Sequence, residues 1–427
     1  MGDPSTGCSV RCDFLDGTPG YVIAVRRAPR PAAGWVHGPT GDVDEVRSSA
    51  SSTLPPELVA KIVPEDVRCS PCKRAAVTSL SASGVRATGS MVCADHVFGG
   101  TLSFDLSCAF ATSMATPDHV AVAESLGYKR AWLYDSPPLY PDVWVTLARC
   151  AERTSTIGLG PGVLVPSLRH PMTNAAAIAT LVELAGAERI AVAVGTGFTG
   201  RFTLGQKPLR WAYVAEYVQA LRALLRGEIV EWEGAKVQML QPAGFGAARP
   251  IEAVPFLLGA AGPKGVATAK SIGAGVFIGG AAPVSGFDHV SCLMMGTVLD
   301  DDDDVASERV FAAAGHGAAV GYHFLFENGR SMEDVPRGEE WVAAYADVPI
   351  DERHLAIHDR HLIAVNDRDR PFVTPETLVA TGAVFRPAEI RERLAAMAAN
   401  GMTEIAYQPA GPDIPRELEA FAAAVRG

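Results

Sequence analysis

The sequence lacks the features that mark membrane, secreted and nucleic-acid-binding proteins. No segment reaches the 18 consecutive apolar residues that a membrane-spanning helix needs. The first residues, MGDPSTGCSVRCDF, contain no basic stretch followed by an apolar one, which is the pattern of a secretion signal. The net charge of −11 is the opposite of the basic excess that a nucleic-acid surface needs. We therefore expect a cytoplasmic protein with neither nucleic-acid nor membrane partners.

The sequence also has little that points to disulfides or to a zinc site. It contains eight cysteines, most of them near the N-terminus. Two pairs, Cys8/Cys12 and Cys69/Cys72, have spacings that occur in halves of zinc sites. A long gap separates the pairs, however, and no pattern of a compact domain surrounds them. Reduced, unpaired thiols of a cytosolic protein are the expected state.

Residues 1–100 differ in composition from the rest of the chain. They are rich in Ser, Gly, Pro and Arg and lack sustained helical periodicity. Such a composition buries too little apolar surface to offset the entropy of ordering the chain. We therefore predict a low-order N-terminal extension, followed by one domain over residues 101–427. A start codon placed too far upstream, with the true start near Met91, is an alternative origin of this extension.

From residue 102 onward, strand patterns alternate with helical patterns. The segment 211–227, for example, is strongly amphipathic and ends in a glycine, as helices often do. The predicted strands cover residues 102–110, 130–135, 157–165, 189–197, 255–260, 275–279, 292–299 and 403–409. Repeated βα units predict an α/β fold with a parallel sheet. Eight of them favour a (β/α)₈ TIM barrel with insertions over a doubly wound sheet.

Glycines cluster where three of the predicted strands end. They are Gly160 and Gly162 in the third strand, Gly195 and Gly197 in the fourth, and Gly259 and Gly262 after the fifth. Glycine lets the backbone approach a ligand closely or adopt a bulge. Tight packing of the barrel is the alternative explanation. Because the three pairs share the face that carries the chemistry in such barrels, we favour a site for a large, flat ligand.

The segment LGAAGPKGVATAKSIGAG (258–275) has the pattern of a strand, a glycine-rich turn and a helix. The first backbone N–H groups of that helix, near Gly262 and Lys264, have no partner within the helix and suit a phosphate group. Pro263 fits the first helical turn. Lys264 either adds positive charge to this site or is a solvated surface lysine.

Four segments together resemble a known family: LGPGVLVPSLRHP, AVAVGTG, LLGAAGPKG and EIAYQPAGPDIPRELEAFA. The chain over residues 102–421 looks like a member of the luciferase-like monooxygenase (bacterial luciferase) superfamily. AAGPKG is most similar to the branch that uses the deazaflavin coenzyme F420, such as methylenetetrahydromethanopterin reductase. The resemblance implies an oxidoreductase that transfers a hydride between F420 and a small organic substrate, at a CH–OH, CH–NH or C=C group. An FMN-dependent monooxygenase and a non-catalytic flavin-binding barrel are the alternatives.

The resemblance also implies where the cofactor binds. In this family the third strand carries a bulge, often with a non-proline cis peptide, that supports the flavin ring; by position it falls at Gly162–Val163. The implied cofactor-binding residues are Asp135, Gly162, Val163, Gly195, Gly197, Ala261, Gly262, Pro263 and Lys264. We expect Gly162→Val to weaken cofactor binding, and Gly160→Ala to have a smaller effect. A homodimer is one candidate assembly.

Two positions depart from the pattern of some deazaflavin enzymes. Those enzymes place an Asp-His pair after the second strand and a catalytic glutamate after the fourth. Here Ser136 follows Asp135, and Phe198 stands at the glutamate position. Sugar-phosphate dehydrogenase chemistry is therefore not expected, and these departures keep the non-catalytic alternative open.

The segment RHLAIHDRHL (353–362) is the obvious source of an acid–base group. His354, His358 and His361 have the spacing of one helical face, and histidine titrates near neutral pH. We predict His358 and His361 as catalytic residues in proton transfer, with structural packing as the alternative. No metal is expected, because no carboxylate at a matching spacing completes a site.

The acidic run Asp300–Asp304 has two possible explanations. It lacks the glycine and the closing glutamate of a known calcium loop. Acidic residues are also stabilised at the start of a helix by the helix dipole. The run is therefore predicted to begin a helix.

Overall fold

The computed structural model describes residues 104–427, apart from residues 243, 261, 281, 282 and 334, and three strands before them. The chain divides into two units, residues 1–100 and 101–427. In the first unit, β1 (Cys8–Cys12), β2 (Tyr21–Val25) and β3 (Met91–Cys93) form an antiparallel sheet with the order β2-β1-β3. Apart from these three strands, residues 1–100 are outside the part of the chain that the structure describes. The low order predicted for them therefore stays a prediction.

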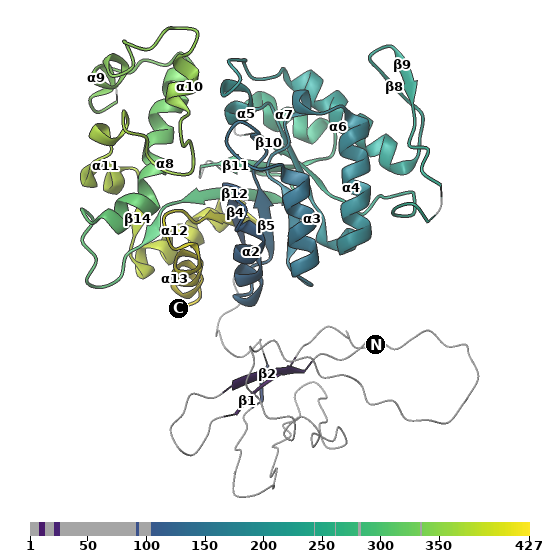
Figure 1. The fold of residues 1–427 in the computed structure, drawn as a ribbon, viewed down its shortest axis with the longest axis horizontal. Helices are drawn as coiled ribbons and strands as arrows, with labels where there is room; N and C mark the ends of the chain where they lie inside the picture. The colour runs from purple at the N-terminus through teal and green to yellow at the C-terminus, as the bar shows by residue number, and fades with distance from the viewer. Residues whose placement is uncertain are drawn as a thin grey trace, which may run out of the picture. The chain divides into compact units, whose positions relative to one another are not determined.

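The second unit is built on a parallel eight-stranded barrel, and all eight predicted strands are confirmed (Figure 1). The strands are β4 (Asp105–Phe110), β5 (Arg130–Leu133), β6 (Gly158–Pro161), β7 (Val192–Gly195), β10 (Phe256–Gly259), β11 (Gly275–Gly279), β12 (Val290–Met295) and β15 (Glu404–Gln408). Their order in the sheet is β6-β5-β4-β15-β12-β11-β10-β7. Parallel bridges from Leu159 to Ile190 and from Leu164 to Val194 join its two edges. This arrangement is the predicted TIM barrel.

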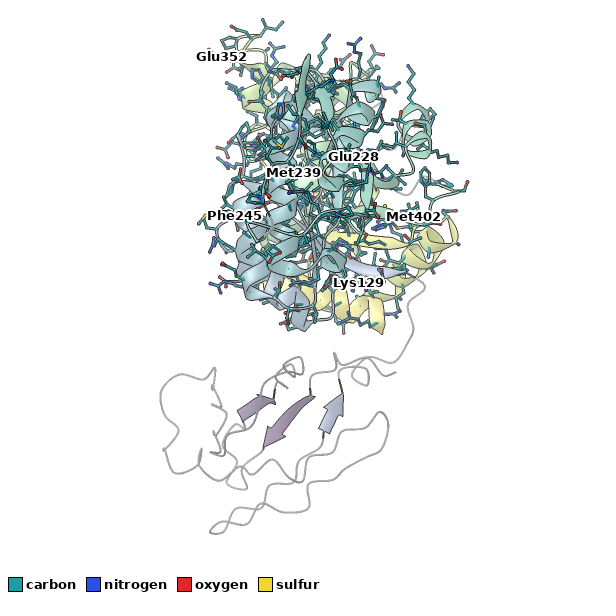
Figure 2. All side chains as sticks on the ribbon, turned by 90° about the vertical axis from the view of Figure 1, so that its right-hand side faces the viewer. Lys129, Glu228, Met239, Phe245, Glu352 and Met402 are labelled. Atoms are coloured by element: carbon teal, nitrogen blue, oxygen red, sulfur yellow. The ribbon has the colours of Figure 1, made fainter. Side chains whose placement is uncertain are left out.

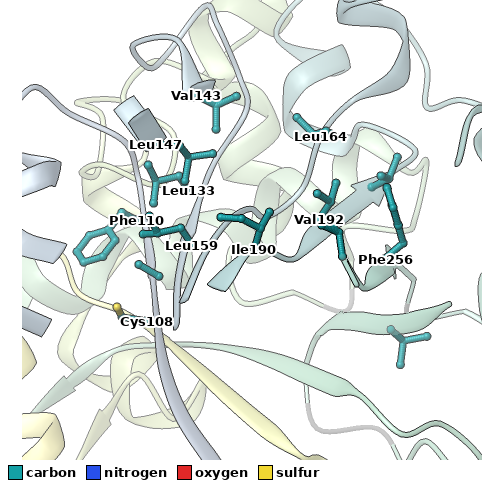
Figure 3. Packing of buried hydrophobic residues seen from close by; sticks show 14 of the residues in the cluster. Cys108, Phe110, Leu133, Val143, Leu147, Leu159, Leu164, Ile190, Val192 and Phe256 are labelled. Atoms are coloured by element: carbon teal, nitrogen blue, oxygen red, sulfur yellow. The ribbon is translucent and has the colours of Figure 1, made fainter. Parts of the chain in front are cut away.

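Helices pack around the outside of the barrel. They are α2 (Thr116–Ser125), α3 (Val143–Arg153), α4 (Pro171–Ala185), α6 (Trp211–Arg226), α7 (Pro263–Ser271), α12 (Pro387–Ala399) and α13 (Ile414–Arg426). Their apolar faces form one cluster with the outward-facing strand residues, part of which is shown in Figure 3. Leu133 of β5 and Leu159 of β6 belong to it, together with Val143 and Leu147 of α3. This shared core fixes the strands, and hence the positions of the loops that follow them.

A second apolar cluster fills the interior of the barrel. It includes small residues such as Ala109 and Ala406 beside the large rings of Trp132 and Phe277. The indole Nε1–H of Trp132 donates to a carboxylate oxygen of Glu404 at 3.0 Å. The interior is therefore a packed core rather than a channel, as is usual in this fold.

A long insertion separates β12 from β15. It contains the small parallel pair β13 (Thr297–Val298) and β14 (Val384–Phe385), together with α8 (Glu308–Glu327), α9 (Gly338–Ala343), α10 (Arg353–Ile357) and α11 (Pro375–Ala380). Its helices gather in one lobe beside the barrel strands (Figure 1). Figure 2 shows Glu352, which precedes α10, near the opposite end of this unit from Lys129, which precedes β5. The insertion therefore reaches toward the end of the barrel at which the strands finish.

The remaining elements are short. They are α5 (Phe198–Phe202), the antiparallel pair β8 (Val230–Trp232) and β9 (Ala235–Val237), and the 3₁₀ turns Pro166–Leu168, Ala187–Arg189 and Arg370–Phe372. Among the helices that the structure describes, none has both the length and the hydropathy needed to cross a membrane.

The cysteine side chains that the structure describes are Cys108, Cys150 and Cys292. All three are buried and free, as expected. The pairs Cys8/Cys12 and Cys69/Cys72 lie outside the described side chains, so the state expected of them stays a prediction.

The acidic run is the clearest error in the sequence-based assignment of elements. Residues 300–304 form a turn, and α8 begins only at Glu308, with Ser307 as its N-cap. Asp303 instead forms an ion pair with Arg309. A local pattern of acidic residues cannot reveal that a basic partner, rather than a helix N-terminus, balances their charge.

Candidate active site at the carboxyl ends of the strands

Directly after β6, the backbone stops pairing with β5 and pairs with β7. The backbone N–H of Gly162 donates to Leu133 O of β5 at 2.8 Å, whereas that of Leu164 donates to Ala193 O of β7 at 2.8 Å. The peptide between Gly162 and Val163 is cis, as the family resemblance predicted. The half-buried side chain of Val163 packs against the interior cluster of the barrel.

Two glycines make room for Val163. Gly195 and Gly259 are paired in register at the ends of β7 and β10. A Cβ atom at Gly195 would lie 2.7 Å from Val163 Cγ2, and one at Gly259 would lie 3.0 Å from Val163 Cγ1. Gly197 has a φ of +85°, and a Cβ there would lie 2.7 Å from Val165 Cγ1. Gly195, Gly197 and Gly259 thus serve packing, and this packing holds Val163 beside the carboxyl ends of β7 and β10.

The start of α7 follows β10 and is open to solvent. Gly262 is its N-cap residue, and no atom outside its chain neighbours would lie within 4 Å of a Cβ added there. The first hydrogen bond of the helix runs from Val266 N to Gly262 O at 3.1 Å. The backbone N–H of Lys264 lies before this bond and therefore has no acceptor within the helix. Pro263 and Lys264 are exposed. Ala261 lies outside the described residues, so its predicted role stays a prediction.

Asp135 is buried and already has a basic partner. Both of its carboxylate oxygens accept hydrogen bonds from Arg169 Nη1 at 2.8 Å, and Arg169 also donates to Asp142 at 2.8 Å. Burial raises the pKa of Asp135, and the charge of Arg169 offsets part of that rise. In this structure Asp135 anchors the loop after the third strand, and its predicted contact with a cofactor stays a prediction.

Residues of the insertion cover part of the barrel mouth. Leu362, with a φ of +62°, packs against the interior cluster. Its carbonyl oxygen accepts a hydrogen bond from Gln408 Nε2 at 2.9 Å, and that of His361 accepts one from Tyr140 Oη at 2.8 Å. Tyr134 Oη donates to Gln408 Oε1 at 2.8 Å. These contacts hold this part of the insertion against the ends of β5 and β15.

The predicted histidine face does not form, because α10 ends at Ile357. His358 and His361 lie beyond the helix, and His354 belongs to no shared cluster with them. Their neighbour is instead His323 of α8. His323 Nδ1 lies 2.8 Å from His361 Nδ1, and His358 Nδ1 lies 3.3 Å from the same atom. Sequence reasoning missed His323, because nothing local relates it to residues 353–362.

The outer nitrogen of each of these imidazoles contacts an oxygen atom. The contacts are His323 Nε2 with Asp369 Oδ2 at 2.8 Å, His358 Nε2 with Glu327 Oε1 at 3.1 Å, and His361 Nε2 with Thr199 Oγ1 at 3.2 Å. Burial lowers the pKa of His358, and burial together with the neighbouring imidazoles lowers that of His361 well below its usual value. Both shifts favour the neutral form of the imidazole.

Phe198, which stands at the glutamate position of some deazaflavin enzymes, lies beside these histidines. Its ring centroid is 6.3 Å from that of His361 and 5.5 Å from that of Phe324. Phe198 therefore makes aromatic contacts with the insertion just after the end of the fourth barrel strand.

A cavity of about 770 Å³ lies away from this region. It is lined by residues at the starts of β10 and β11, including Phe256 and Gly275. The guanidinium of Arg222 in its wall is bonded to the carbonyl oxygens of Ile272 and Gly273. Because the starts of barrel strands serve stability rather than chemistry, we do not assign the active site to this cavity.

Relatives with known names match part of the chain. The 5,10-methylenetetrahydromethanopterin reductase of Archaeoglobus fulgidus is 31% identical over 169 residues, which cover 39% of this chain and 49% of that protein. An F420-dependent glucose-6-phosphate dehydrogenase of Microbacterium testaceum is 30% identical over 172 residues, covering 37% and 50%. The chain thus spans about half the length of these curated relatives.

Solved structures agree on the fold. The coenzyme F420 dependent tetrahydromethanopterin reductase of Methanopyrus kandleri superimposes with a TM-score of 0.52 at 18% identity, over 75% of this chain and 98% of that one. An F420-dependent secondary alcohol dehydrogenase gives 0.51 at 17% identity, over 76% and 100%. The family model for luciferase-like monooxygenases matches residues 111–404. The chain belongs to the luciferase-like monooxygenase family.

Proposed function

We propose that this protein binds the deazaflavin coenzyme F420 at the carboxyl ends of β6, β7 and β10, and transfers a hydride between it and a small organic substrate. The position of Val163 is the observation that carries the proposal. Its half-buried side chain fits over Gly195 and Gly259 at the carboxyl ends of β7 and β10, and a flat ring can rest on its exposed part. The named curated relatives, which include an F420-dependent enzyme, support the same cofactor.

The residues present fit both ends of such a cofactor. Val163 offers an apolar support to the ring, and the backbone N–H groups at the start of α7 offer a site for a phosphate. The open space at Gly262 leaves that helix end accessible. Lys264 adds positive charge beside it. The deazaflavin supplies the hydride chemistry, while the protein supplies position and electrostatics.

The insertion contributes the far wall of the proposed site. Leu362 packs against the apolar cluster of the barrel interior. The acid–base role predicted for His358 and His361 stays a prediction. Thr199 is the residue through which His361 would reach the mouth, because its hydroxyl contacts the outer nitrogen of that imidazole.

An FMN-dependent monooxygenase is the second candidate, because the chain belongs to the family of luciferase-like monooxygenases. Calorimetric titration of the purified protein with F420 and with FMN distinguishes the two. We expect low-micromolar or tighter binding of F420 and much weaker binding of FMN. Preferential binding of FMN would contradict the F420 assignment and leave the fold untouched. Tight F420 binding without turnover of any tested alcohol, imine or enone would point to a non-catalytic barrel.

A further inference from the structure

Two of the three clustered histidines, His323 and His358, bring their Nδ1 atoms close to the Nδ1 atom of the third, His361. The Nδ1–Nδ1 distances to His361 are 2.8 Å from His323 and 3.3 Å from His358. The ring centroids of the three pairs are 4.7, 5.0 and 5.7 Å apart, and one ring nitrogen of each imidazole lies within 4.8 Å of those of the other two. All three side chains are buried. They come from separate parts of the insertion, α8 and the segment after α10.

The outer contacts decide which nitrogens carry hydrogens. A carboxylate only accepts hydrogen bonds, so Nε2 of His323 and Nε2 of His358 donate to Asp369 and Glu327. In a neutral imidazole the other nitrogen then carries a lone pair, and in both residues that atom is Nδ1. When both imidazoles are neutral, two lone pairs therefore point at His361 Nδ1. One hydrogen on His361 Nδ1 can form a good hydrogen bond to only one of these two Nδ1 atoms. The lone pair of the other Nδ1 atom is then left without a good donor.

A metal ion would satisfy all three nitrogens at once. A tetrahedral Zn²⁺ with Zn–N distances of about 2.0–2.1 Å holds two ligand nitrogens about 3.3 Å apart, close to the separations found here. Imidazole nitrogens suit zinc and similar transition metals. Histidine ligands usually donate their other N–H to a carboxylate or another oxygen, and here Asp369, Glu327 and Thr199 provide those acceptors.

We propose that His323, His358 and His361 form a binding site for a divalent transition-metal ion of the Zn²⁺ type, bound through their three Nδ1 atoms. The ion links α8 to the residues that follow α10. Because Leu362 follows His361 directly and packs on the barrel interior, the ion also holds this part of the insertion over the mouth of the barrel. This proposal differs from the expectation of no metal that was drawn from the sequence alone.

The test is the metal content of the purified full-length protein, grown with added zinc and purified without chelator. We expect about one Zn²⁺ per chain by elemental analysis. After removal of the zinc, titration with Co²⁺ should produce visible absorption bands of a low-symmetry site with nitrogen ligands. Neither measurement uses F420. A negative result for the metal site would therefore leave the proposed function untouched, and the reverse also holds. Absence of stoichiometric zinc, together with absence of the Co²⁺ bands, would overturn the proposal.

Variants locate the ion. His323→Ala should lose zinc, whereas His354→Ala, which changes a histidine of the same segment outside the cluster, should retain it. Circular dichroism shows whether each variant is folded. If His323→Ala does not fold, Glu327→Gln decides instead, because loss of such an outer partner typically weakens metal affinity roughly 10- to 100-fold. Zinc binding of parental strength in folded His323→Ala or in Glu327→Gln would show that the histidines form only a hydrogen-bonded cluster.

Discussion

The side chain of Val163 occupies the space that a side chain at Gly195 would need: a Cβ at Gly195 would lie 2.7 Å from Val163 Cγ2. Atoms cannot remain at that distance, so any larger residue at position 195 must displace Val163. The glycine and the valine thus form one unit, and the shape of the proposed ring site depends on both.

The first prediction follows from this contact. Gly195→Ala should displace Val163 and weaken F420 binding by roughly tenfold, which corresponds to about 1.4 kcal/mol. The barrel core is large enough for the variant to stay folded. Gly279→Ala is the control, since a Cβ at this exposed position at the end of β11 would meet no atom within 4 Å. Calorimetry measures both affinities, and an unchanged affinity in Gly195→Ala would remove Val163 from the proposed site.

The second prediction concerns the two glycines of the third strand. A Cβ at Gly160 would lie 2.0 Å from the carbonyl oxygen of Ala191, whereas one at Gly162 would lie 2.9 Å from Trp132 Cβ. Gly160→Ala should therefore destabilise the protein more than Gly162→Ala, by about 1–3 kcal/mol for overpacking of this kind. The smaller effect expected from the sequence for Gly160→Ala concerned cofactor binding rather than stability, and it stays a prediction. Urea denaturation of the two variants gives the comparison, and the reverse order would refute it.

The third prediction tests the anchor of the third-strand loop. Arg169→Met leaves the buried carboxylate of Asp135 without its partner, which should cost about 3–5 kcal/mol of unfolding free energy. The matched control is Arg153→Met, whose partner Asp118 is 59% exposed, so that at most about 1 kcal/mol is expected. Thermal and urea unfolding measure both. Equal losses in the two variants would mean that Asp135 does not depend on Arg169.

The fourth prediction is a pH dependence at Glu404, whose carboxylate lies inside the barrel between Trp132 and His289. Burial raises its pKa, but the hydrogen bond and charge of His289 and the charge of Arg130 outweigh this and leave the pKa below its ordinary value of 4.5. A carboxyl group with a depressed pKa stabilises the fold above its unfolded-state pKa and loses that contribution as the pH falls through the folded-state value.

Glu404→Gln should therefore lower the free energy of unfolding at pH 7, by about 1–3 kcal/mol for the loss of hydrogen bonds to a charged group. The difference from the parent should shrink as the pH drops below 4.5. Glu228→Gln, at an exposed ion pair with Arg226, should show little change across the same range. Urea unfolding at a series of pH values measures this, and a difference that grows on acidification would contradict the assignment.

The fifth prediction addresses the division of the chain. Residues 101–427 form a unit with their own core, so a chain that begins at Thr101 should fold and bind F420 as the full chain does. Circular dichroism and the F420 titration check this. Loss of folding in the shortened chain would show that residues 1–100 are a structural part of the barrel protein.

The sequence by itself determined the barrel and the location of its mouth. Strands and helices are indicated by apolar residues that repeat every 2 or every 3.6 residues, and helix ends by glycine. All of these signals come from residues that are close together along the chain. For that reason all eight strands, the α6 helix ending at Gly227 and the start of α7 at Pro263 could be predicted. The cis peptide at Gly162–Val163 was also predicted, but only through resemblance to a family.

The tertiary structure alone decided which side chains meet. His323 joins His358 and His361 only because α8 packs against the segment after α10, and no local pattern encodes that packing. The fit of Val163 over Gly195 likewise depends on the register between neighbouring strands. Local sequence sets the elements through short-range sterics and hydrogen bonds. Contacts between distant segments are set by how the whole core packs, which is why the chemistry of this site could not be predicted as well as its place in the fold.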